Sequence, residues 1–397
     1  MTEAASAAVP ARITNPVVAS LAASAVAAGA LGLAAIVGWR QAALFVVGTL
    51  AGLVLYHAAF GFTSAWRIFL TDRRSAGLRA QMVMLGVACL VFVPLISSGT
   101  VFGQSVRGSA APLGVALIAG SFLFGIGMQL GGGCASGTLY SAGGGSTRMF
   151  VTLAFFVVGS LLGTAHAPFW DTMPATPAVS LLALHGPFVA LLFSLGAMAI
   201  VFGVSLRLER QRHGRAVSIT TTPGAEYGRW WGGPWPLLWG ALGLAAINVA
   251  TLALAGRPWG VTSAFALWGA KAAAAMGVDV ASWPYWSVAA RAQSLSDPLI
   301  FDITSVMNIG IMLGALAAAA LAGRFSPVLQ VPARSLMAAA IGGLLLGYGA
   351  RLASGCNIGA YFSGVASTSL HGWLWFACAF AGNWFGARLR PVFGLGR

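Results

Sequence analysis

Residues 125–146 read Gly-Ile-Gly-Met-Gln-Leu-Gly-Gly-Gly-Cys-Ala-Ser-Gly-Thr-Leu-Tyr-Ser-Ala-Gly-Gly-Gly-Ser and interrupt an otherwise apolar sequence. An apolar run reaches Gly131, and Gly132 and Gly133 follow it directly before Cys134. Each glycine costs a helix interior roughly 1 kcal/mol relative to alanine, so the pattern predicts that a helix ends here. The thiol of Cys134 is therefore expected on a turn whose neighbours carry no side chains.

The same pattern returns 222 positions later, where residues 347–364 read Gly-Tyr-Gly-Ala-Arg-Leu-Ala-Ser-Gly-Cys-Asn-Ile-Gly-Ala-Tyr-Phe-Ser-Gly. The matched positions are Gly125, Gly127, Leu130, Gly133, Cys134, Gly137 and Ser141 with Gly347, Gly349, Leu352, Gly355, Cys356, Gly359 and Ser363. A second matched pair lies upstream, Gly61-Phe-Thr-Ser-Ala-Trp66 and Gly260-Val-Thr-Ser-Ala-Phe265. Two matched segments in the same order indicate an internal duplication.

The composition predicts an all-α membrane protein that crosses the bilayer many times. Hydrophobic residues make up 58% of the chain and charged residues only 8%. A spanning helix needs roughly 20 apolar residues, and the first apolar run is too long for the hydrophobic part of a cleaved signal peptide. Apolar continuity predicts about ten transmembrane helices, at residues 16–38, 41–60, 80–97, 111–129, 149–166, 178–205, 235–255, 303–323, 335–350 and 371–387.

The number of spans sets the relation between the two copies. Five predicted spans precede the second set, and an odd number places the second copy upside down in the membrane. We therefore expect an inverted-topology repeat, whose re-entrant Gly-Cys loops meet near the midplane and hold the transported solute. The predicted divisions are a cytoplasmic tail (1–15), a first repeat (16–177), a second repeat (178–388) and a second cytoplasmic tail (389–397).

The basic residues predict the orientation of the chain. Of the 21 arginines and one lysine, sixteen fall on one side if both termini are cytoplasmic, against six elsewhere, which fits the positive-inside rule. This count requires residues 131–147 to return to the side they entered from. The net charge of +14 then reflects topology and contact with anionic membrane lipid, and not nucleic-acid binding. Residues 226–236 are expected to form a cytoplasmic linker.

Cys134 and Cys356 are the candidate substrate-binding residues. Stacked broken helices would bring their soft, polarizable thiols into line, which suits a soft sulfur-containing solute. The other cysteines, Cys89 and Cys378, lie in plain apolar runs and are expected to pack as small side chains. All four cysteines lie in apolar or glycine-rich stretches, so we expect free thiols and not disulfides.

The groups near these cysteines predict that the solute is an anion. Backbone N–H groups exposed at a helix start after Gly133 and Gly355 carry partial positive charge. Arg148 and His371, which match within one residue between the copies, could be further donors. Arg148 could instead be a cytoplasmic anchor, and Arg351 a snorkelling or paired arginine. Lys271 could be a pore cation or a helix-end residue that faces water. The other expected substrate-binding residues are Gly137, Gly359, Gln129, Arg351, Thr63, Ser64, Thr262 and Ser263.

Several other functions are excluded by missing patterns. The sequence has no phosphate-binding Gly-x-x-x-x-Gly-Lys-Ser/Thr stretch, and the glycines of residues 125–131 lack the strand that a dinucleotide site needs. The eight acidic residues lie outside the centres of the predicted spans, so a carboxylate proton relay is not expected. The sequence has no cluster of histidine and carboxylate residues of the kind that binds a metal. We therefore expect neither a metal nor a cofactor.

These motifs resemble those of the YeeE/YedE family of membrane sulfur transporters, and the resemblance spans roughly residues 40–388. It implies an all-helical protein in which central cysteines, here Cys134 and Cys356, pass thiosulfate inward by S–H hydrogen bonds. A small TusA-like cytoplasmic sulfur carrier is the partner that the family implies. A third family cysteine usually precedes the first Thr-Ser-Ala turn, where this chain has Phe60-Gly61-Phe62.

The sequence thus predicts a non-enzymatic transporter or channel of the bacterial inner membrane that imports a small sulfur-containing anion, most plausibly thiosulfate. A related sulfur or selenium oxyanion is an alternative substrate. Two further alternatives are a membrane sulfur-transfer protein that forms a cysteine persulfide, which requires a lowered thiol pKa, and a sulfur-compound sensor that signals to a cytoplasmic partner.

Overall fold

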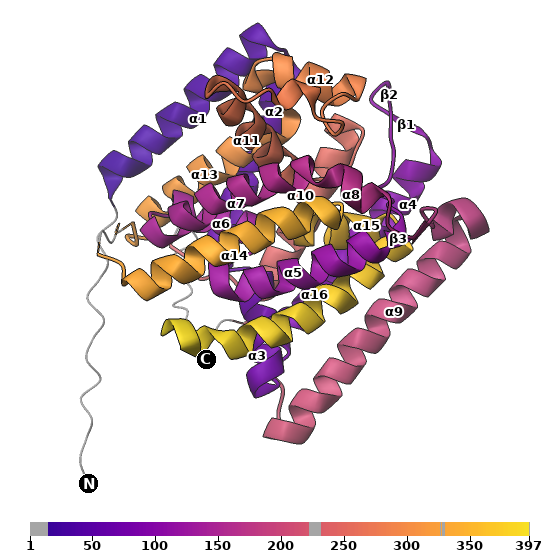
Figure 1. Ribbon diagram of the computed structural model, residues 1–397. Coiled ribbons are helices and arrows are strands. Elements are labelled where there is room, and N and C mark those ends of the chain that lie inside the picture. Colours follow the sequence, from indigo (N-terminus) through magenta and orange to yellow (C-terminus); the bar gives the residue numbers. More distant parts are fainter. Residues whose placement is uncertain (1–14, 222–231, 326, 328–329, 397) are drawn as a thin grey trace.

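The computed structural model describes residues 15–221, 232–325, 327 and 330–396, and these are almost entirely helical (Figure 1). Residues 1–14, most of the predicted linker at 226–236 and the terminal Arg397 lie outside the described residues. The first half contains α1 (Pro16–Ile36), α2 (Trp39–His57), α3 (Phe62–Asp72), α4 (Ala76–Ser97), β1 (Thr100–Val101), β2 (Gln104–Ser105), β3 (Leu113–Gly114), α5 (Val115–Gly131), α6 (Ala135–Gly143), α7 (Thr147–Ala165), α8 (Ala167–Asp171) and β4 (Ala175–Thr176).

The second half repeats this order of long and short helices. It contains α9 (Leu181–His213), α10 (Leu237–Ala255), α11 (Thr262–Ala275), η1 (Val280–Ser282), α12 (Ala289–Ser296), η2 (Leu299–Phe301), α13 (Ile303–Leu321), α14 (Ala333–Leu352), η3 (Asn357–Phe362), α15 (Ser363–Ala366), α16 (Leu370–Leu389) and η4 (Arg390–Phe393). The four strands are two residues long and form two antiparallel pairs, β1 with β2 and β3 with β4.

The predicted polytopic membrane fold is confirmed. Within the described residues, nine helical segments are long and apolar enough to cross a bilayer, and each coincides with one of the ten predicted spans. The tenth prediction, residues 371–387, falls on helix α16, which does not count among these nine. Several polar and amphipathic side chains, among them His371 and Asn383, interrupt the apolar character of this helix.

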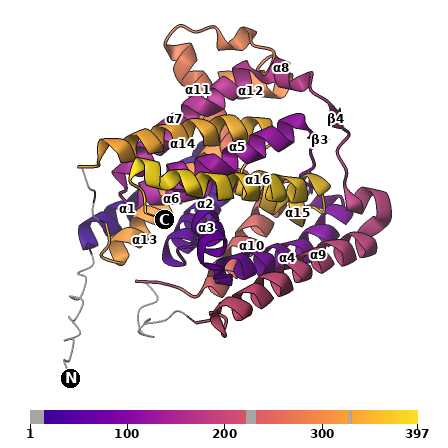
Figure 2. The ribbon, with the colours of Figure 1, turned by 60° about the horizontal axis from the view of Figure 1, so that its bottom comes forward.

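Contacts between the halves dominate the packing. Helix α2 packs on α13 and α4 packs on α10, whereas α7 packs on α14 and α16 packs on α5. The last four of these helices form one layer in both views (Figures 1 and 2). The outer helices also pack on helices of the other half: α1 packs on α13 and α9 packs on α4, at opposite edges of the molecule. Each half therefore needs the other to bury its helices.

Small residues let the backbones of these pairs approach closely. A Cβ atom at Gly52 of α2 would overlap the carbonyl of Ile311 in α13, and one at Gly314 would overlap the carbonyl of Thr49. Across the α5–α16 pair, a Cβ at Gly125 would overlap the carbonyl of Ala379. Small-residue contacts of this kind are typical of helix pairs in membranes, where van der Waals packing replaces the hydrophobic effect.

The predicted helix break before Cys134 is confirmed. Helix α5 ends at Gly131, and Gly132 adopts a left-handed conformation with φ +88°, which glycine reaches without the steric penalty of other residues. Helix α6 then has only 9 residues, about 14 Å, which is too short to cross a bilayer. Since α6 cannot cross, residues 131–147 are expected to return to the side of the membrane at which α5 ends. The inverted relation of the two repeats, and the boundaries drawn from it, stay predictions.

Candidate functional site

Cys134 and Cys356 occupy equivalent positions in their turns. Each is the residue just before a helical segment, in extended backbone with φ −82° and ψ −172° for Cys134 and φ −105° and ψ −167° for Cys356. The Gly137 N–H donates to Cys134 Sγ at 3.4 Å, and the Ser136 hydroxyl lies at 3.4 Å from the same sulfur. Both cysteines are thus placed at helix starts, where backbone N–H groups are available to an anion.

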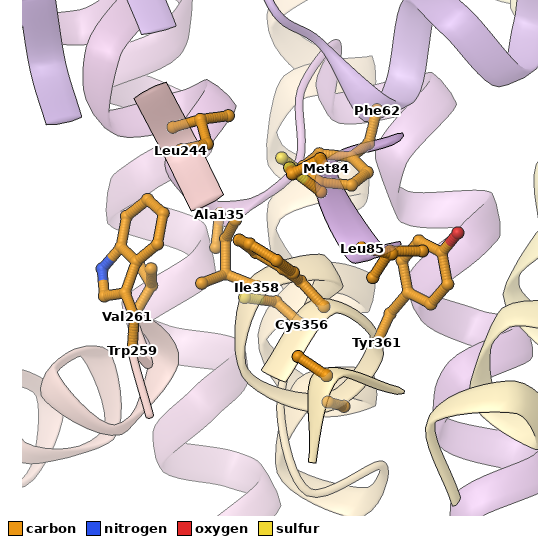
Figure 3. Close-up of a cluster of buried hydrophobic side chains, with 14 of the residues drawn as sticks. Phe62, Met84, Leu85, Ala135, Leu244, Trp259, Val261, Cys356, Ile358 and Tyr361 are labelled. Carbon is orange, nitrogen blue, oxygen red and sulfur yellow. The ribbon is translucent and has the colours of Figure 1, made fainter. Parts of the chain in front are cut away.

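The structure brings these two turns together in the interior. Helix α6 contacts η3, and both cysteines belong to the same buried cluster, with exposed fractions of 2% for Cys134 and 0% for Cys356. Figure 3 shows Cys356 beside Ala135, the residue that follows Cys134, with Trp259 and Val261 on one side and Tyr361 on the other. All four cysteines are free thiols, as predicted.

A pocket of about 240 Å³ opens next to the Cys356 turn. It is lined by Gly355 and Gly359, which flank the cysteine, and by the predicted residues Thr262, Ser263 and Arg351. Arg257 adds a second guanidinium, and Gly108, Ser109, Pro258, Trp259, Gly260, Val261, Ser354 and Ser363 complete the wall. Two guanidiniums and several hydroxyls in the wall of a pocket next to a buried cysteine suit a small anion.

The two arginines of this pocket are held in place without a carboxylate partner in the described residues. Arg257 donates from Nη2 to the Thr304 hydroxyl at 3.2 Å, and Arg351 donates from Nη1 to the Tyr285 hydroxyl at 3.0 Å. Arg291 stacks on the same tyrosine ring at 4.0 Å. Because neutral groups position the guanidiniums, their charge stays available to a solute in the pocket.

Side chains that the sequence analysis missed hold the backbone of the Gly260 turn. The Trp259 N–H donates to Asn248 Oδ1 at 2.8 Å, and Ser363 Oγ donates to the Trp259 carbonyl at 2.8 Å. On the other side, Asn308 donates from Nδ2 to the Val261 carbonyl at 3.0 Å. Only Ser363 carried a signal in the sequence, through its match with Ser141 in the first copy.

The first copy has a related pocket at the opposite end of α10. Its volume is about 270 Å³, and it is lined by Gly61, the predicted Ser64 and Arg74 together with Ala59, Phe60, Ala65, Ile68, Ala76, Gly77, Gln81, Val217 and Leu237. Leu237 begins α10, whereas Arg257 of the Cys356 pocket follows the end of that helix. Ser64 and its counterpart Ser263 thus face pockets at opposite ends of one long helix.

The remaining predicted residues lie elsewhere around the turns. Gln129 is fully buried and donates from Nε2 to Asn383 Oδ1 at 2.6 Å and to the Thr63 carbonyl at 3.1 Å, so its amide hydrogens are already engaged. Thr63 and Thr262 are buried at the starts of α3 and α11. Lys271 donates to the Leu295 and Asp297 carbonyls, which fits the alternative of a helix-end residue.

Two arginines hold the end of α5, just before the Cys134 turn. Arg148 donates to the Gly131 carbonyl at 2.7 Å, and Arg390 donates to the Gln129 carbonyl at 2.9 Å. Cations near a helix C-terminus stabilise its negative dipole end. Burial and the nearby charges of Arg67 and Arg148 lower the pKa of Arg390 to about 10.

The site has the hydrogen-bond donors of an anion path. In the described parts of the chain, no group of three or more histidine, cysteine or acidic residues could hold a metal ion. The geometry offers hydrogen bonding by thiol, hydroxyl and backbone N–H groups, with two guanidiniums in the pocket wall.

Comparison with known proteins identifies the family. The model of the sulphur transport family matches residues 57–385. The thiosulfate transporter TsuA of Spirochaeta thermophila is 27% identical over 350 residues, which cover 85% of this chain and 96% of that protein. TsuA of Escherichia coli (strain K12) is 23% identical over the same share of this chain and 91% of its own length.

A stronger but shorter match is to the probable transporter YedE of Escherichia coli (strain K12), at 35% identity over 142 residues. That match covers 35% of this chain and 34% of YedE, so it spans about a third of each protein. The family model covers most of the chain, and the helices supply the membrane spans. This multi-pass membrane protein therefore belongs to the sulphur transport family.

Proposed function

We propose that this protein imports thiosulfate across the bacterial inner membrane, with Cys356 and Cys134 as successive binding thiols. The observation that carries the proposal is the pocket lined by Arg257, Arg351 and the glycines on either side of Cys356. The helix α6 that follows Cys134 contacts the segment η3 that follows Cys356. The family and the relatives named thiosulfate transporters support the same substrate.

The sequence of events follows from the order of these groups. The two guanidiniums raise the local concentration of anions in the pocket. Thr262 and Ser263 hydroxyls and the N–H groups at the η3 start then replace water around the ion. Thiol hydrogen bonds are weaker than the roughly 1 kcal/mol of an ordinary one, so the ion can leave each station, as conduction through several sites requires.

The proposed orientation places the Cys356 pocket outside and the Ser64 pocket in the cytoplasm, with both termini cytoplasmic. The positive-inside count supports it, and so does the position of the pockets at opposite ends of α10. A TusA-like carrier on the cytoplasmic side stays a prediction from the family resemblance. A related sulfur or selenium oxyanion is the alternative substrate.

Replacement of the central thiols tests the proposal in cells. We expect Cys134→Ala and Cys356→Ala each to abolish thiosulfate-dependent growth of a sulfur-auxotrophic host, because each removes one station. Cys378→Ala is the matched control and should grow normally, since Cys378 lies on α16 and lines neither pocket. Normal growth of both central variants at normal protein levels would reject the thiol path.

Mass spectrometry separates this path from sulfur-transfer chemistry. Protein exposed to thiosulfate should keep the mass of the unmodified chain if the thiols only bind the ion. A stable gain of one sulfur atom on Cys134 or Cys356 would favour a persulfide instead.

A further inference from the structure

The two thiol stations differ in their polar neighbours. Around Cys134, the Ser136 hydroxyl contacts the sulfur and the Thr138 hydroxyl donates to the Cys134 carbonyl. The corresponding positions after Cys356 are Ile358 and Ala360, which carry no hydroxyl. The second copy instead has Asn357 where the first has Ala135. A duplicated element has thus kept its thiol and changed the polar group next to it.

Asn357 is a buried amide without a protein partner. Its side chain is 0% exposed, and neither Oδ1 nor Nδ2 has a hydrogen-bond partner within the described ranges 15–221, 232–325, 327 and 330–396. An unpaired buried polar group costs free energy comparable to a lost hydrogen bond, so each such group in a native structure calls for an explanation. Asn357 directly follows Cys356, so we look for the partner of its amide at the Cys356 turn.

The backbone at this position is also unusual. Segment η3 is a π-helical turn, in which the Tyr361 N–H lies 3.3 Å from the Cys356 carbonyl and the Ala360 N–H lies 2.9 Å from it. The equivalent α6 is an ordinary α-helix. π-Helical turns are rare and occur frequently at functional sites.

Nearby buried polar ends point elsewhere. The indole nitrogen of Trp259 and the hydroxyl of Tyr361 are also buried and lack hydrogen-bond partners among the described residues, but Figure 3 shows both directed away from Cys356. Among these buried unpaired groups, Asn357 is the one that belongs to the residue directly after Cys356. It can supply both a donor and an acceptor at the same station.

We propose that the Asn357 side-chain amide donates a hydrogen bond to an oxygen of the anion held at the Cys356 thiol. The station then recognises two features at once, a soft sulfur by the thiol and a hard oxygen by the amide. Thiosulfate has both features, whereas hydrosulfide has no oxygen and sulfate has no terminal sulfur. The inference rests on the proposed function and assigns the selectivity of that path to its second copy.

Three variants in proteoliposomes test this assignment. Asn357→Ala introduces the residue of the first copy and removes the donor, and we expect the KM for labelled thiosulfate to rise about tenfold, the size typical of a hydrogen bond to a charged group. Asn357→Ser keeps a small hydroxyl donor and should recover part of the loss. Ser160→Ala removes another buried unpaired hydroxyl, on α7, and should leave the KM unchanged.

The remaining readouts distinguish the possible failures. Inhibition by hydrosulfide relative to thiosulfate should increase in Asn357→Ala, which a purely structural role would not cause. If the wild type takes up no thiosulfate, the proposed function fails. If the wild type transports and Asn357→Ala has the wild-type KM and the wild-type selectivity, the role of Asn357 is rejected while the thiol path stands. If Asn357→Ala does not fold, Asn357→Leu, which also lacks a hydrogen-bond donor, takes its place in the comparison.

Discussion

Three guanidinium groups lie near the C-terminal end of α5, just before the Cys134 turn. Arg148 and Arg390 bind successive carbonyls at the end of this helix. Arg67 of α3 acts on Arg390 through its charge. The Arg67 carbonyl accepts a hydrogen bond from the Thr71 hydroxyl, whereas its guanidinium has no hydrogen bond or ion pair in the described chain. The first two arginines stabilise the helix end, whereas Arg67 adds repulsion.

Removal of the Arg67 charge should stabilise the protein. Because the pKa of Arg390 is lowered to about 10 in the folded state, the unfolded state binds more protons above that pH, and stability rises as pH passes through about 10. At neutral pH the protonated Arg390 therefore costs stability. We expect Arg67→Gln to raise the free energy of unfolding by about 0.5 kcal/mol at low salt, measured by thermal unfolding in detergent.

Salt provides the control for this electrostatic explanation. The gain should vanish near 1 M salt, where the Debye length is about 3 Å. Arg212→Gln, on the exposed end of α9, should change little at either salt concentration. A gain in Arg67→Gln that persists at high salt would show that the effect is not charge repulsion.

For single residues, the sequence predicted the positions that depend on local chemistry. Consecutive glycines located the turns of Cys134 and Cys356, because the loss of helix propensity is a property of adjacent residues. Asn248 and Arg257 could not be predicted as site residues, since their roles depend on contacts with segments far away in the chain. Gln129 was predicted as a solute donor, but its engagement with Asn383 depends on the packing of α5 on α16.

At the scale of elements, one carboxylate connects α9 to the rest of the molecule. Glu209 is fully buried and accepts hydrogen bonds from the Ser75 N–H and hydroxyl, from the Val217 N–H and from Arg79 Nη2. Arg74 lies at 3.5 Å on its exposed side. Most of α9 otherwise faces outward, so this group of polar contacts fixes its end against the start of α4.

Loss of this charge should destabilise the protein strongly. Glu209→Gln leaves Arg79 buried without its counter-charge, and removal of one partner from a buried pair typically costs about 3 kcal/mol or more. Thermal unfolding in detergent should show the loss. Asp72→Asn is the control, because Asp72 is exposed and its pair with His213 is long at 3.9 Å; it should change stability by less than about 0.5 kcal/mol. Equal effects of the two variants would contradict the account.

The long helices were predictable for a physical reason, and the short ones were not. A membrane span needs an unbroken apolar run, which composition alone reveals. Helices α3 and α11, and the π-helical turn η3, form in segments that were predicted only as turns. Their helical structure depends on burial between the two halves, which apolar continuity does not record.

Across the whole molecule, helices of each half pack on helices of the other half. The Ser64 pocket and the Cys356 pocket, which Ser263 lines, lie at opposite ends of α10, although the two serines occupy the same position in matched segments. A direct repeat would place matched residues on the same side of the membrane, whereas an inverted repeat places them on opposite sides.

Labelling from the two sides of the membrane tests the inverted repeat. In right-side-out membranes a membrane-impermeant thiol reagent should modify Ser263→Cys and spare Ser64→Cys, and inside-out vesicles should give the reverse. The wild-type chain provides the background, since Cys134 and Cys356 are nearly inaccessible. Modification of both variants from the same side would reject the inverted arrangement.

Transport by the central thiols can be measured as uptake of labelled thiosulfate into proteoliposomes that contain only this protein. We expect uptake by the wild type that saturates with thiosulfate concentration, and loss of that uptake in Cys134→Ala and in Cys356→Ala while Cys378→Ala transports normally. Wild-type liposomes that take up no more thiosulfate than empty ones, or central variants that transport as fast as the wild type, would contradict this expectation.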